Sequence, residues 1–253
     1  MSADASDWPD AYARHVLAEV GSTNSEAARL APGLTRPAWI MARRQTGGRG
    51  RRGRAWVSPE GNFFASLVMR SPGDPAQAAL RSFVAALALD DALGALVGPA
   101  GRFTLKWPND VLLNGGKVAG ILLESGGQGP QVNHLIIGIG VNLIAAPPAD
   151  AVEPGALKPV SVLGETGLRF TPDELLDRLG PAFSRWESQF TAYGFAPIRT
   201  AWLARAARLG QTIRARTMGE TYEGRFEGLA EDGALVLGTD QGRRTISAAD
   251  IFF

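Results

Sequence analysis

The sequence contains no cysteine and only two histidines among its 253 residues. The lack of cysteine excludes disulfides, thiolate metal sites and cysteine nucleophiles, and it suits a reducing compartment. His15 and His134 lie far apart in the sequence, so a histidine metal site is not expected. The N-terminus lacks a basic segment followed by an apolar run, and no stretch approaches the roughly 20 apolar residues that span a bilayer. These absences predict a cytoplasmic protein with no membrane partner.

Excess charge of either sign is also missing. There are 26 basic and 25 acidic residues, which gives a net charge of +1. A net charge this close to zero argues against a protein that binds nucleic acid or an anionic membrane over its whole surface, so any binding of anions must be local. The hydrophobic content of 45% is sufficient for one substantial core and a second small one.

The order of apolar patterns predicts an α+β domain in which a mixed β-sheet is flanked by helices. Branched and aromatic runs predict strands at residues 37–44, 61–70, 103–107, 117–125 and 134–143. Helical spacing and capping residues predict helices at 24–31, 75–97, 172–190 and 196–208. Thr23 and Glu26 have the spacing of a capping box for the first of these helices. The segments 45–59 and 145–159 are predicted to be loops, the second a surface excursion.

After residue 208 the pattern changes to short apolar runs divided by glycine-containing turns at Gly219, Gly233 and Gly242. Such runs are typical of a small antiparallel β-barrel. The sequence therefore predicts two domains, a catalytic domain over 1–208 and a barrel over 209–253.

Residues 43–54, here called the arginine loop, contain six arginines, four glycines and no acid. Glycine backbone N–H groups and planar guanidinium forks suit a triphosphate or an acyl-phosphate. Two other interpretations are a solvated basic loop and a nucleic-acid contact. Gly48, Gly50 and Gly53 also satisfy the dinucleotide-binding spacing, but the residues that follow indicate a turn and a strand rather than the required helix, so that match is treated as accidental.

Two lysines and an aspartate surround the next predicted turn. Lys106 ends one strand, Asp110 follows in the turn, and Lys117 begins the next strand. A lysine ammonium is a compact charge for a carboxylate or phosphate, and Asp110 can pair with lysine or help to hold Mg²⁺. Each of these residues alone is more often a solvated turn residue than a catalytic one.

Together these motifs resemble the biotin protein ligases in order and spacing. The motifs are the STN triplet at 22–24, GRGRRGRAW at 48–56, KWPND at 106–110, GKVAGIL at 116–122 and GIGVN at 138–142. The resemblance covers residues 15 to 253. It implies the class II synthetase-like catalytic fold of biotin and lipoate ligases, followed by a small SH3-like barrel.

The resemblance also implies a reaction in two steps. The biotin carboxylate attacks the α-phosphate of MgATP to give biotinyl-5′-AMP and pyrophosphate, and a lysine of a biotin carboxyl carrier protein then attacks the mixed anhydride. Biotin, ATP and Mg²⁺ are the expected small molecules. The metal is expected to be bound mainly through the ATP phosphates, with no certain protein ligand.

Carried over by motif position, one group of residues is expected to bind biotin. Ser22, Thr23 and Asn24 are expected to hydrogen-bond its ureido end, because buried polar edges require matched partners. The resemblance assigns further ligand contacts to Gln45, Gly48, Trp56, Gly120, Gly138 and Asn142. Of these, Trp56 is expected to support the adenine or the folded loop, Gly120 and Gly138 to allow close approach of the strands, and Asn142 to reach the adenylate. An ordinary core role for Trp56 fits the sequence equally well.

The other group is expected to handle the phosphates. Arg49, Gly50 and Arg51 are expected to close over the acyl-phosphate, and the arginine loop is expected to be mobile until ligand orders it. Lys117 is expected to stabilise the transition state, since negative charge moves onto the phosphoryl oxygens there. The predicted catalytic residues are Lys117, Arg51, Lys106 and Asp110.

Three rival functions are compatible with parts of the pattern. The first is a lipoate ligase, which shares the fold and the adenylation chemistry but is expected to lack the arginine loop. The second is an RNA-binding module, which predicts salt-sensitive binding without ATP turnover. The third is an inactive homologue that only stores biotin. About twenty residues precede Ser22, too few for a winged helix-turn-helix domain, so no DNA partner is expected. A monomer or a weak homodimer is predicted.

Overall fold

The computed structural model describes residues 8–70, 73–127, 132–148, 151–153 and 155–253. Seven strands form the larger sheet, in the order β1-β2-β3-β7-β6-β5-β4. Their bounds are β1 Ala13–Val20, β2 Ala38–Gln45, β3 Phe63–Arg70, β4 Phe103–Lys106, β5 Asp110–Leu113, β6 Gly116–Gly126 and β7 His134–Val141. Only β1 and β2 pair in parallel, and every other neighbour is antiparallel, so the predicted mixed sheet is confirmed.

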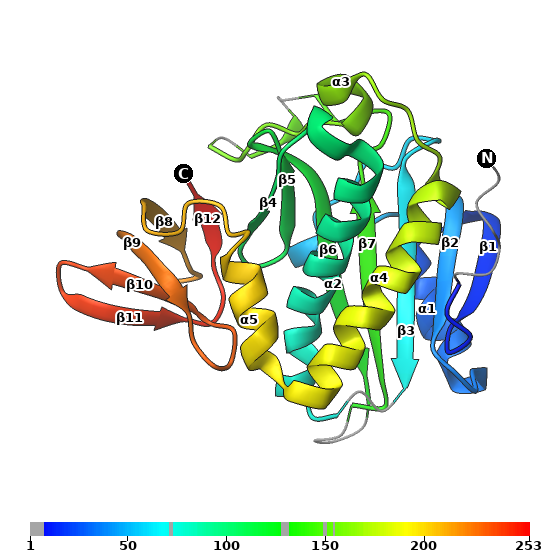
Figure 1. The fold of residues 1–253 in the computed structure, drawn as a ribbon, viewed down its shortest axis with the longest axis horizontal. Helices are drawn as coiled ribbons and strands as arrows, with labels where there is room; N and C mark the ends of the chain where they lie inside the picture. Colours follow the sequence, from blue (N-terminus) through cyan, green and yellow to red (C-terminus); the bar gives the residue numbers. More distant parts are fainter. Residues whose placement is uncertain (1–7, 71–72, 128–131, 149–150, 154) are drawn as a thin grey trace.

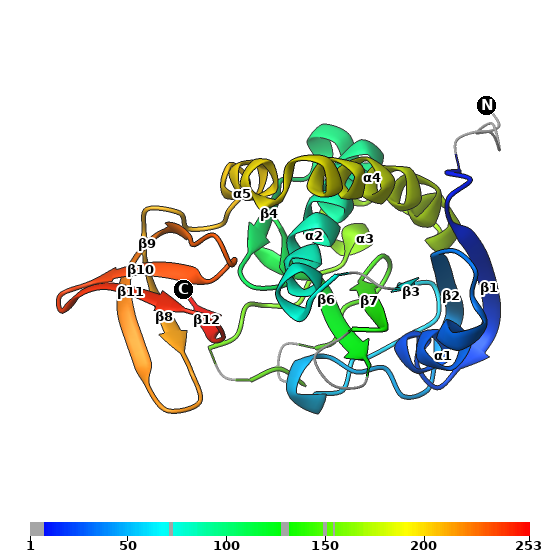
Figure 2. The same ribbon diagram turned by 90° about the horizontal axis from the view of Figure 1, so that it is seen from below.

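The sheet carries helices on both faces (Figures 1 and 2). The α-helices are α1 Thr23–Leu30, α2 Pro75–Val97, α3 Val162–Thr166, α4 Pro172–Tyr193 and α5 Phe195–Leu203, and the short 3-10 turns are η2 Ala31–Gly33, η3 Arg51–Gly53 and η4 Gly98–Ala100. Figure 2 shows α2 and α4 on one side of the sheet and α1 on the other. The α1 side is therefore the one that remains open for a site.

Helix α2 supplies much of the core beneath the sheet. The stretch Pro75–Ala100 is long and apolar enough to cross a membrane by composition, which corrects the expectation that no stretch approaches this limit. In the fold, however, α2 buries residues such as Val84, Leu87 and Leu93 against the sheet and α4. The apolar composition of α2 is thus explained by its place in the core.

The capping residues of two helices behave differently. At α4, Thr171 and Glu174 form the complete capping box, with Pro172 in the first turn. At α1 the N-cap is Ser22, and no side chain caps the helix, so the predicted box from Thr23 to Glu26 is wrong. Thr23 instead directs its hydroxyl to Gln45 and Ser66, toward the open face of the sheet.

Two strands of the larger sheet have no clear signal in the sequence. Strand β1 is a half-exposed edge strand in which charged residues interrupt the apolar ones, and β5 has only four residues between two turns. Both are defined by their partners, β2 for the first and β6 for the second. Tertiary pairing therefore adds them to a sheet whose centre the apolar runs predict.

The predicted C-terminal β-structure is present as a five-stranded antiparallel sheet, in the order β11-β10-β9-β8-β12. Its strands are β8 Thr212–Arg216, β9 Thr221–Leu229, β10 Leu235–Thr239, β11 Gly242–Ile246 and β12 Asp250–Phe252. It lies beyond β4, β5 and α5 in Figure 1. The indole N–H of Trp107 donates to the carbonyl of Gly233 at 3.0 Å, which ties the β4–β5 turn to the β9–β10 turn. This contact brings the smaller sheet next to the lysine-containing turn.

Candidate active site

A cavity of about 460 Å³ is lined by residues that reach from α1, such as Asn24, to the smaller sheet, such as Asp250. It gathers almost all of the residues that the sequence predicts for ligand binding and catalysis. The predicted residues that line it are Ser22, Thr23, Asn24, Gln45, Arg49, Gly50, Arg51, Trp56, Lys106, Asp110, Lys117, Gly120, Gly138 and Asn142. Gly48 lies just outside this lining, beside Gln45 and the carbonyl of Trp56.

One end of the cavity, here called the neutral end, is a chain of hydrogen bonds among Thr23, Asn24, Gln45, Ser58 and Ser66. The Gln45 Oε1 atom accepts from the Thr23 backbone N–H at 2.8 Å, which leaves the Gln45 Nε2 atom to donate to Ser58 Oγ at 3.2 Å. Ser66 Oγ lies 2.8 Å from Thr23 Oγ1 and 2.6 Å from Asn24 Oδ1. The polar groups at this end are therefore held in fixed positions before any ligand arrives.

Glycines in β6 and β7 make room for the side chains above them. A Cβ atom at Gly138 would lie 2.2 Å from Asn24 Oδ1, and one at Gly140 would lie 2.6 Å from the indole of Trp56. Trp56 also covers Gly120, at 3.2 Å from the position of a Cβ there. Gly120 and Gly138 were expected to let the strands approach a ligand, and that expectation stays a prediction. In the structure Gly138 makes room for Asn24, and Gly120 makes room for Trp56 together with Gly140, which the sequence did not single out.

The opposite end, here called the charged end, contains Lys106, Asp110, Lys117, Arg51 and Asp250. The Asp110 carboxylate lies 2.7 Å from Lys117 Nζ and 3.5 Å from Lys106 Nζ. Burial acts to raise the pKa of Asp110, but the two ammonium groups outweigh it and hold that pKa below its usual value. Burial lowers the pKa of Lys106, although Asp110 opposes the shift. The pair of lysines thus shares one ionised carboxylate.

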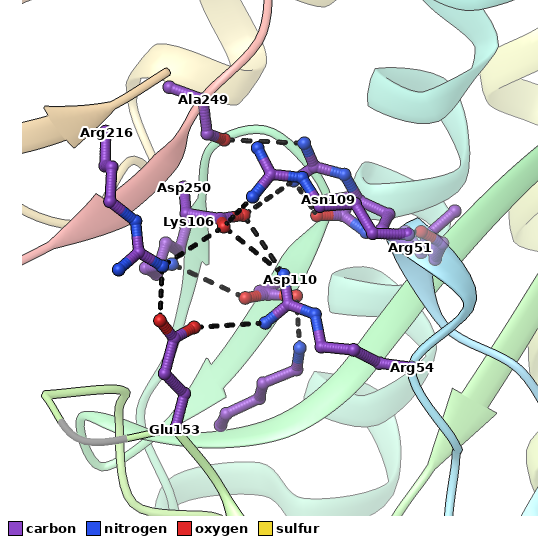
Figure 3. Close-up of polar contacts among 12 residues, drawn as sticks. Arg51, Arg54, Lys106, Asn109, Asp110, Glu153, Arg216, Ala249 and Asp250 are labelled. Atoms are coloured by element: carbon purple, nitrogen blue, oxygen red, sulfur yellow. Dashed lines mark hydrogen bonds and ion pairs between the residues drawn. The ribbon is translucent and has the colours of Figure 1, made fainter. Parts of the chain in front are cut away.

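Asp250, at the start of β12, is a functional candidate that the sequence did not reveal. Its carboxylate is 12% exposed and lies 2.6 Å from Arg52, 3.3 Å from Arg54 and 3.9 Å from Arg51 (Figure 3). Arg216 of β8 also reaches it, at 3.7 Å. The smaller sheet therefore supplies an acid to the arginine loop, where the loop itself has none.

The half-buried Arg51 side chain lies at the junction between the β4–β5 turn and the smaller sheet. It donates to Asn109 Oδ1 at 3.3 Å and to the carbonyl of Ala249 at 3.4 Å (Figure 3). Burial lowers the pKa of Arg51, while Asp250 and Asp110 act in the opposite direction. The arginine loop closes on itself as well, because Gly50 N donates to the Arg54 carbonyl at 2.7 Å. Its expected mobility without ligand stays a prediction.

The segment 145–159 is not the simple surface excursion that the sequence predicted. Its described residues Pro147, Val152, Glu153, Leu157 and Pro159 line the cavity. Glu153 pairs with Arg54 at 3.6 Å and with Arg216, so the segment joins the arginine loop to the smaller sheet (Figure 3). Alanine and proline gave no periodic signal that could reveal this role.

Comparisons with known proteins agree with the motifs and the geometry. Residues 20–142 match the model of the biotin/lipoate A/B protein ligase family, and residues 209–253 match that of the biotin protein ligase C terminal domain. A biotin--[acetyl-CoA-carboxylase] ligase from Paracoccus denitrificans is 61% identical over 238 residues, which cover 94% of this chain and 99% of that protein. The chain belongs to the biotin protein ligase family. The predicted resemblance and the predicted ligase class are thus confirmed.

Other biotin protein ligases match at lower identity. The bifunctional ligase/repressor BirA of Bacillus subtilis (strain 168) is 36% identical, over 84% of this chain but only 65% of its own length. The biotin protein ligase from Aquifex aeolicus in complex with biotin and ATP has a TM-score of 0.79 and 26% identity, covering 94% of this chain and 97% of that one. The fold is therefore that of a biotin protein ligase in both of its sheets.

Proposed function

We propose that the protein forms biotinyl-5′-AMP from biotin and ATP and transfers the biotin to a lysine of a biotin carboxyl carrier protein. The single observation that carries this proposal is the division of one cavity into a neutral end and a charged end. Biotin has a neutral ureido group at one end and a carboxylate at the other. Its two ends match the two ends of the cavity, with the reacting carboxylate directed to the lysines.

In the first step the biotin carboxylate attacks the α-phosphate of ATP and pyrophosphate leaves. Negative charge shifts among the phosphoryl oxygens, and preorganised cations stabilise that shift. Lys117 and Arg51 are the candidates, since both line the cavity and each lies near an acid that holds it in place. Lys106 is buried and pairs with Asp110 at 3.5 Å, which supports a role for Lys106 in organising the phosphate site.

At the neutral end, Ser22, Thr23, Asn24 and Gln45 bind the ureido group. Trp56, which lies over Gly120 and Gly140, supports the adenine or the folded arginine loop. Asn142 donates to the carbonyl of Val160 at 3.1 Å, so its amide anchors the end of segment 145–159 beside the nucleotide. In the second step the amine of the carrier lysine attacks the acyl carbon, loses its proton, and AMP leaves.

Mg²⁺ fits this site as a partner of the ATP phosphates. Among the described residues no group of three His, Asp or Glu side chains gathers to hold a metal ion, and Asp110 is already shared by two lysines. When bound, Mg²⁺ would neutralise phosphate charge, and Asp110, one of the carboxylates of the charged end, would help to hold it.

The test is biotin-dependent exchange of pyrophosphate into ATP, because it reports the first step without a carrier. Exchange with biotin but not with lipoate supports the proposal and excludes the lipoate ligase. Transfer is then measured as biotin incorporation into a carrier domain, with the same domain carrying a Lys→Arg substitution at its acceptor as the control. Salt-sensitive RNA binding without exchange would support the binding-module alternative instead.

We further propose that the chain divides into a catalytic domain over 1–208 and a barrel domain over 209–253, the latter supported by its own family match. A cytoplasmic location, a monomeric or weakly dimeric state and the lack of a DNA partner stay predictions. Sedimentation of the purified protein, with and without biotin and ATP, tests the oligomeric state.

A further inference from the structure

Glu124 is an acid on β6 that reaches the neutral end from outside the cavity. It lines a neighbouring groove of about 430 Å³, which shares Arg51 and Asn109 with the cavity, and it is not part of the cavity wall. Its Oε2 atom nevertheless accepts a hydrogen bond from Asn24 Nδ2 at 2.7 Å. Glu124 thus touches a predicted ligand-binding residue from behind.

This contact determines which way the Asn24 amide faces. An ionised carboxylate can only accept hydrogen bonds, so the NH₂ group of Asn24 must point to Glu124. The carbonyl Oδ1 then lies 2.6 Å from Ser66 Oγ and above Gly138, where no Cβ obstructs it. With Glu124 ionised, the donor and acceptor pattern of Asn24 at the cavity is fixed in a single orientation.

The same carboxylate faces the arginine loop. Its Oε1 atom lies 3.6 Å from Arg49 Nη2, and Arg49 also donates to Ser25 Oγ at 3.2 Å on the first turn of α1. The two side chains are 39% and 43% exposed, so this pair alone adds little to stability in the free protein. A ligand that covers it would exclude water and strengthen it.

We propose that Glu124 is a positioning residue for biotin: it fixes the orientation of the Asn24 amide and holds Arg49 of the arginine loop over the neutral end. The inference rests on the proposed function, and Glu124 acts on the biotin site through Asn24 and Arg49. Biotin recognition and closure of the arginine loop then depend on one carboxylate.

The test compares biotin binding by calorimetry in the wild type, Glu124→Gln and Glu124→Ala. Glutamine keeps the shape and an acceptor for Asn24 but loses the charge that attracts Arg49, so we expect several-fold weaker binding. Alanine removes both contacts, and we expect binding about tenfold or more weaker, as for loss of a hydrogen bond to a charged group. In pyrophosphate exchange the KM for biotin should rise more than the KM for ATP.

Limited trypsin digestion gives an independent readout, because the arginine loop offers cleavage sites at Arg49, Arg51, Arg52 and Arg54. Saturating biotin should slow cleavage there in the wild type and should do so less in Glu124→Gln. Glu227→Gln is the matched control, since Glu227 pairs with Arg243 at 2.8 Å, outside the arginine loop and outside the cavity lining. It should leave binding and cleavage unchanged.

The outcomes separate the inference from the function on which it rests. Wild-type protein that binds no biotin would remove the proposed function and this inference together. Wild-type binding with both Glu124 variants within twofold would overturn the inference alone. Equal rises in the KM for biotin and for ATP, with a lower unfolding temperature, would overturn it too, because they would indicate a general structural role.

Discussion

The two ends of the cavity are built in different ways. The neutral end is built from uncharged amides and hydroxyls of α1, β2, β3 and the segment that carries Ser58, joined by continuous hydrogen bonds, and Glu124 of β6 accepts from Asn24 behind them. The charged end draws its members from the arginine loop, the β4–β5 turn, segment 145–159 and the smaller sheet. The uncharged hydrogen bonds of the neutral end join residues between 23 and 66, whereas the ion pairs of the charged end join segments that are far apart in the sequence.

This difference has an energetic side. Buried uncharged groups need one partner each, but a buried carboxylate between two ammonium groups requires all three charges to be in place. The buried Lys106, Asp110 and Lys117 group of the charged end should therefore be more sensitive to the loss of one residue than the neutral end. Substitutions at each end can test that expectation.

The largest expected effect is on activity, at Lys117. Lys117→Ala removes the cation closest to Asp110 at the cavity and should lower pyrophosphate exchange by about 10²-fold or more, as for loss of a preorganised group that stabilises the transition state. Lys158→Ala is the control, because the Lys158 side chain is exposed and lies outside the cavity lining. Exchange that persists in Lys117→Ala would remove Lys117 from the catalytic assignment.

The next largest effect is on stability, at Asp110. Asp110→Asn leaves Lys106 buried without its carboxylate and should lower the free energy of unfolding by about 3 kcal/mol. Because the folded pKa of Asp110 lies below its unfolded value, its contribution is present above about pH 4 and is lost as the pH falls through the folded pKa.

Urea unfolding of this variant across pH 3 to 7 checks both statements. The wild type should lose stability on acidification more steeply than Asp110→Asn. Asp240→Asn, in an exposed turn of the smaller sheet, should match the wild type. An unchanged pH slope in Asp110→Asn would show that the lysines do not depend on this carboxylate.

A smaller effect is expected at the neutral end. The methyl group of Gly138→Ala would lie 2.2 Å from Asn24 Oδ1 and displace that amide, so biotin binding should weaken by about tenfold while the KM for ATP changes little. Gly126→Ala creates a similar conflict with the His134 ring, at 2.3 Å, away from the cavity. Calorimetry with biotin should separate the two, and equal affinities would contradict the role given to Gly138.

The smallest effect is expected at Asp250. Asp250→Ala removes a shared acid from Arg51, Arg52 and Arg54, and because these arginines are partly exposed the cost should be about 1 kcal/mol. The KM for ATP should change several-fold and that for biotin should not. Glu227→Ala, which breaks a pair with Arg243 at 2.8 Å elsewhere in the smaller sheet, is the control. A change in the KM for biotin alone would contradict the assignment of Asp250 to the charged end.

Much of the fold and of the neutral end could be predicted because the signals are local. The central strands have apolar runs, α4 has its capping box at 171–174, and the STN triplet and Gln45 meet as the resemblance implies. The lysines and Asp110 meet because one tight turn carries two of them and the next strand begins with the third.

The remainder could not be predicted, because it depends on long-range contacts. Arg52 and Asp250 are 198 positions apart, and a single acid on a short strand has the pattern of a solvated residue. Thr23 has the local signal of a capping residue, yet its hydroxyl is used by Gln45 and Ser66. Glu124 lies near the end of the apolar strand β6, where a single acid has the pattern of a solvated residue.

The contact between β12 and the arginine loop has a practical consequence for design. The hydrogen bonds of the neutral end join residues between 23 and 124, whereas residues of the C-terminal segment 209–253 contact the arginine loop at the charged end, among them Ala249 and Asp250. Exchanging this C-terminal segment for that of a relative should therefore change the KM for ATP and leave the selectivity for biotin over lipoate unchanged.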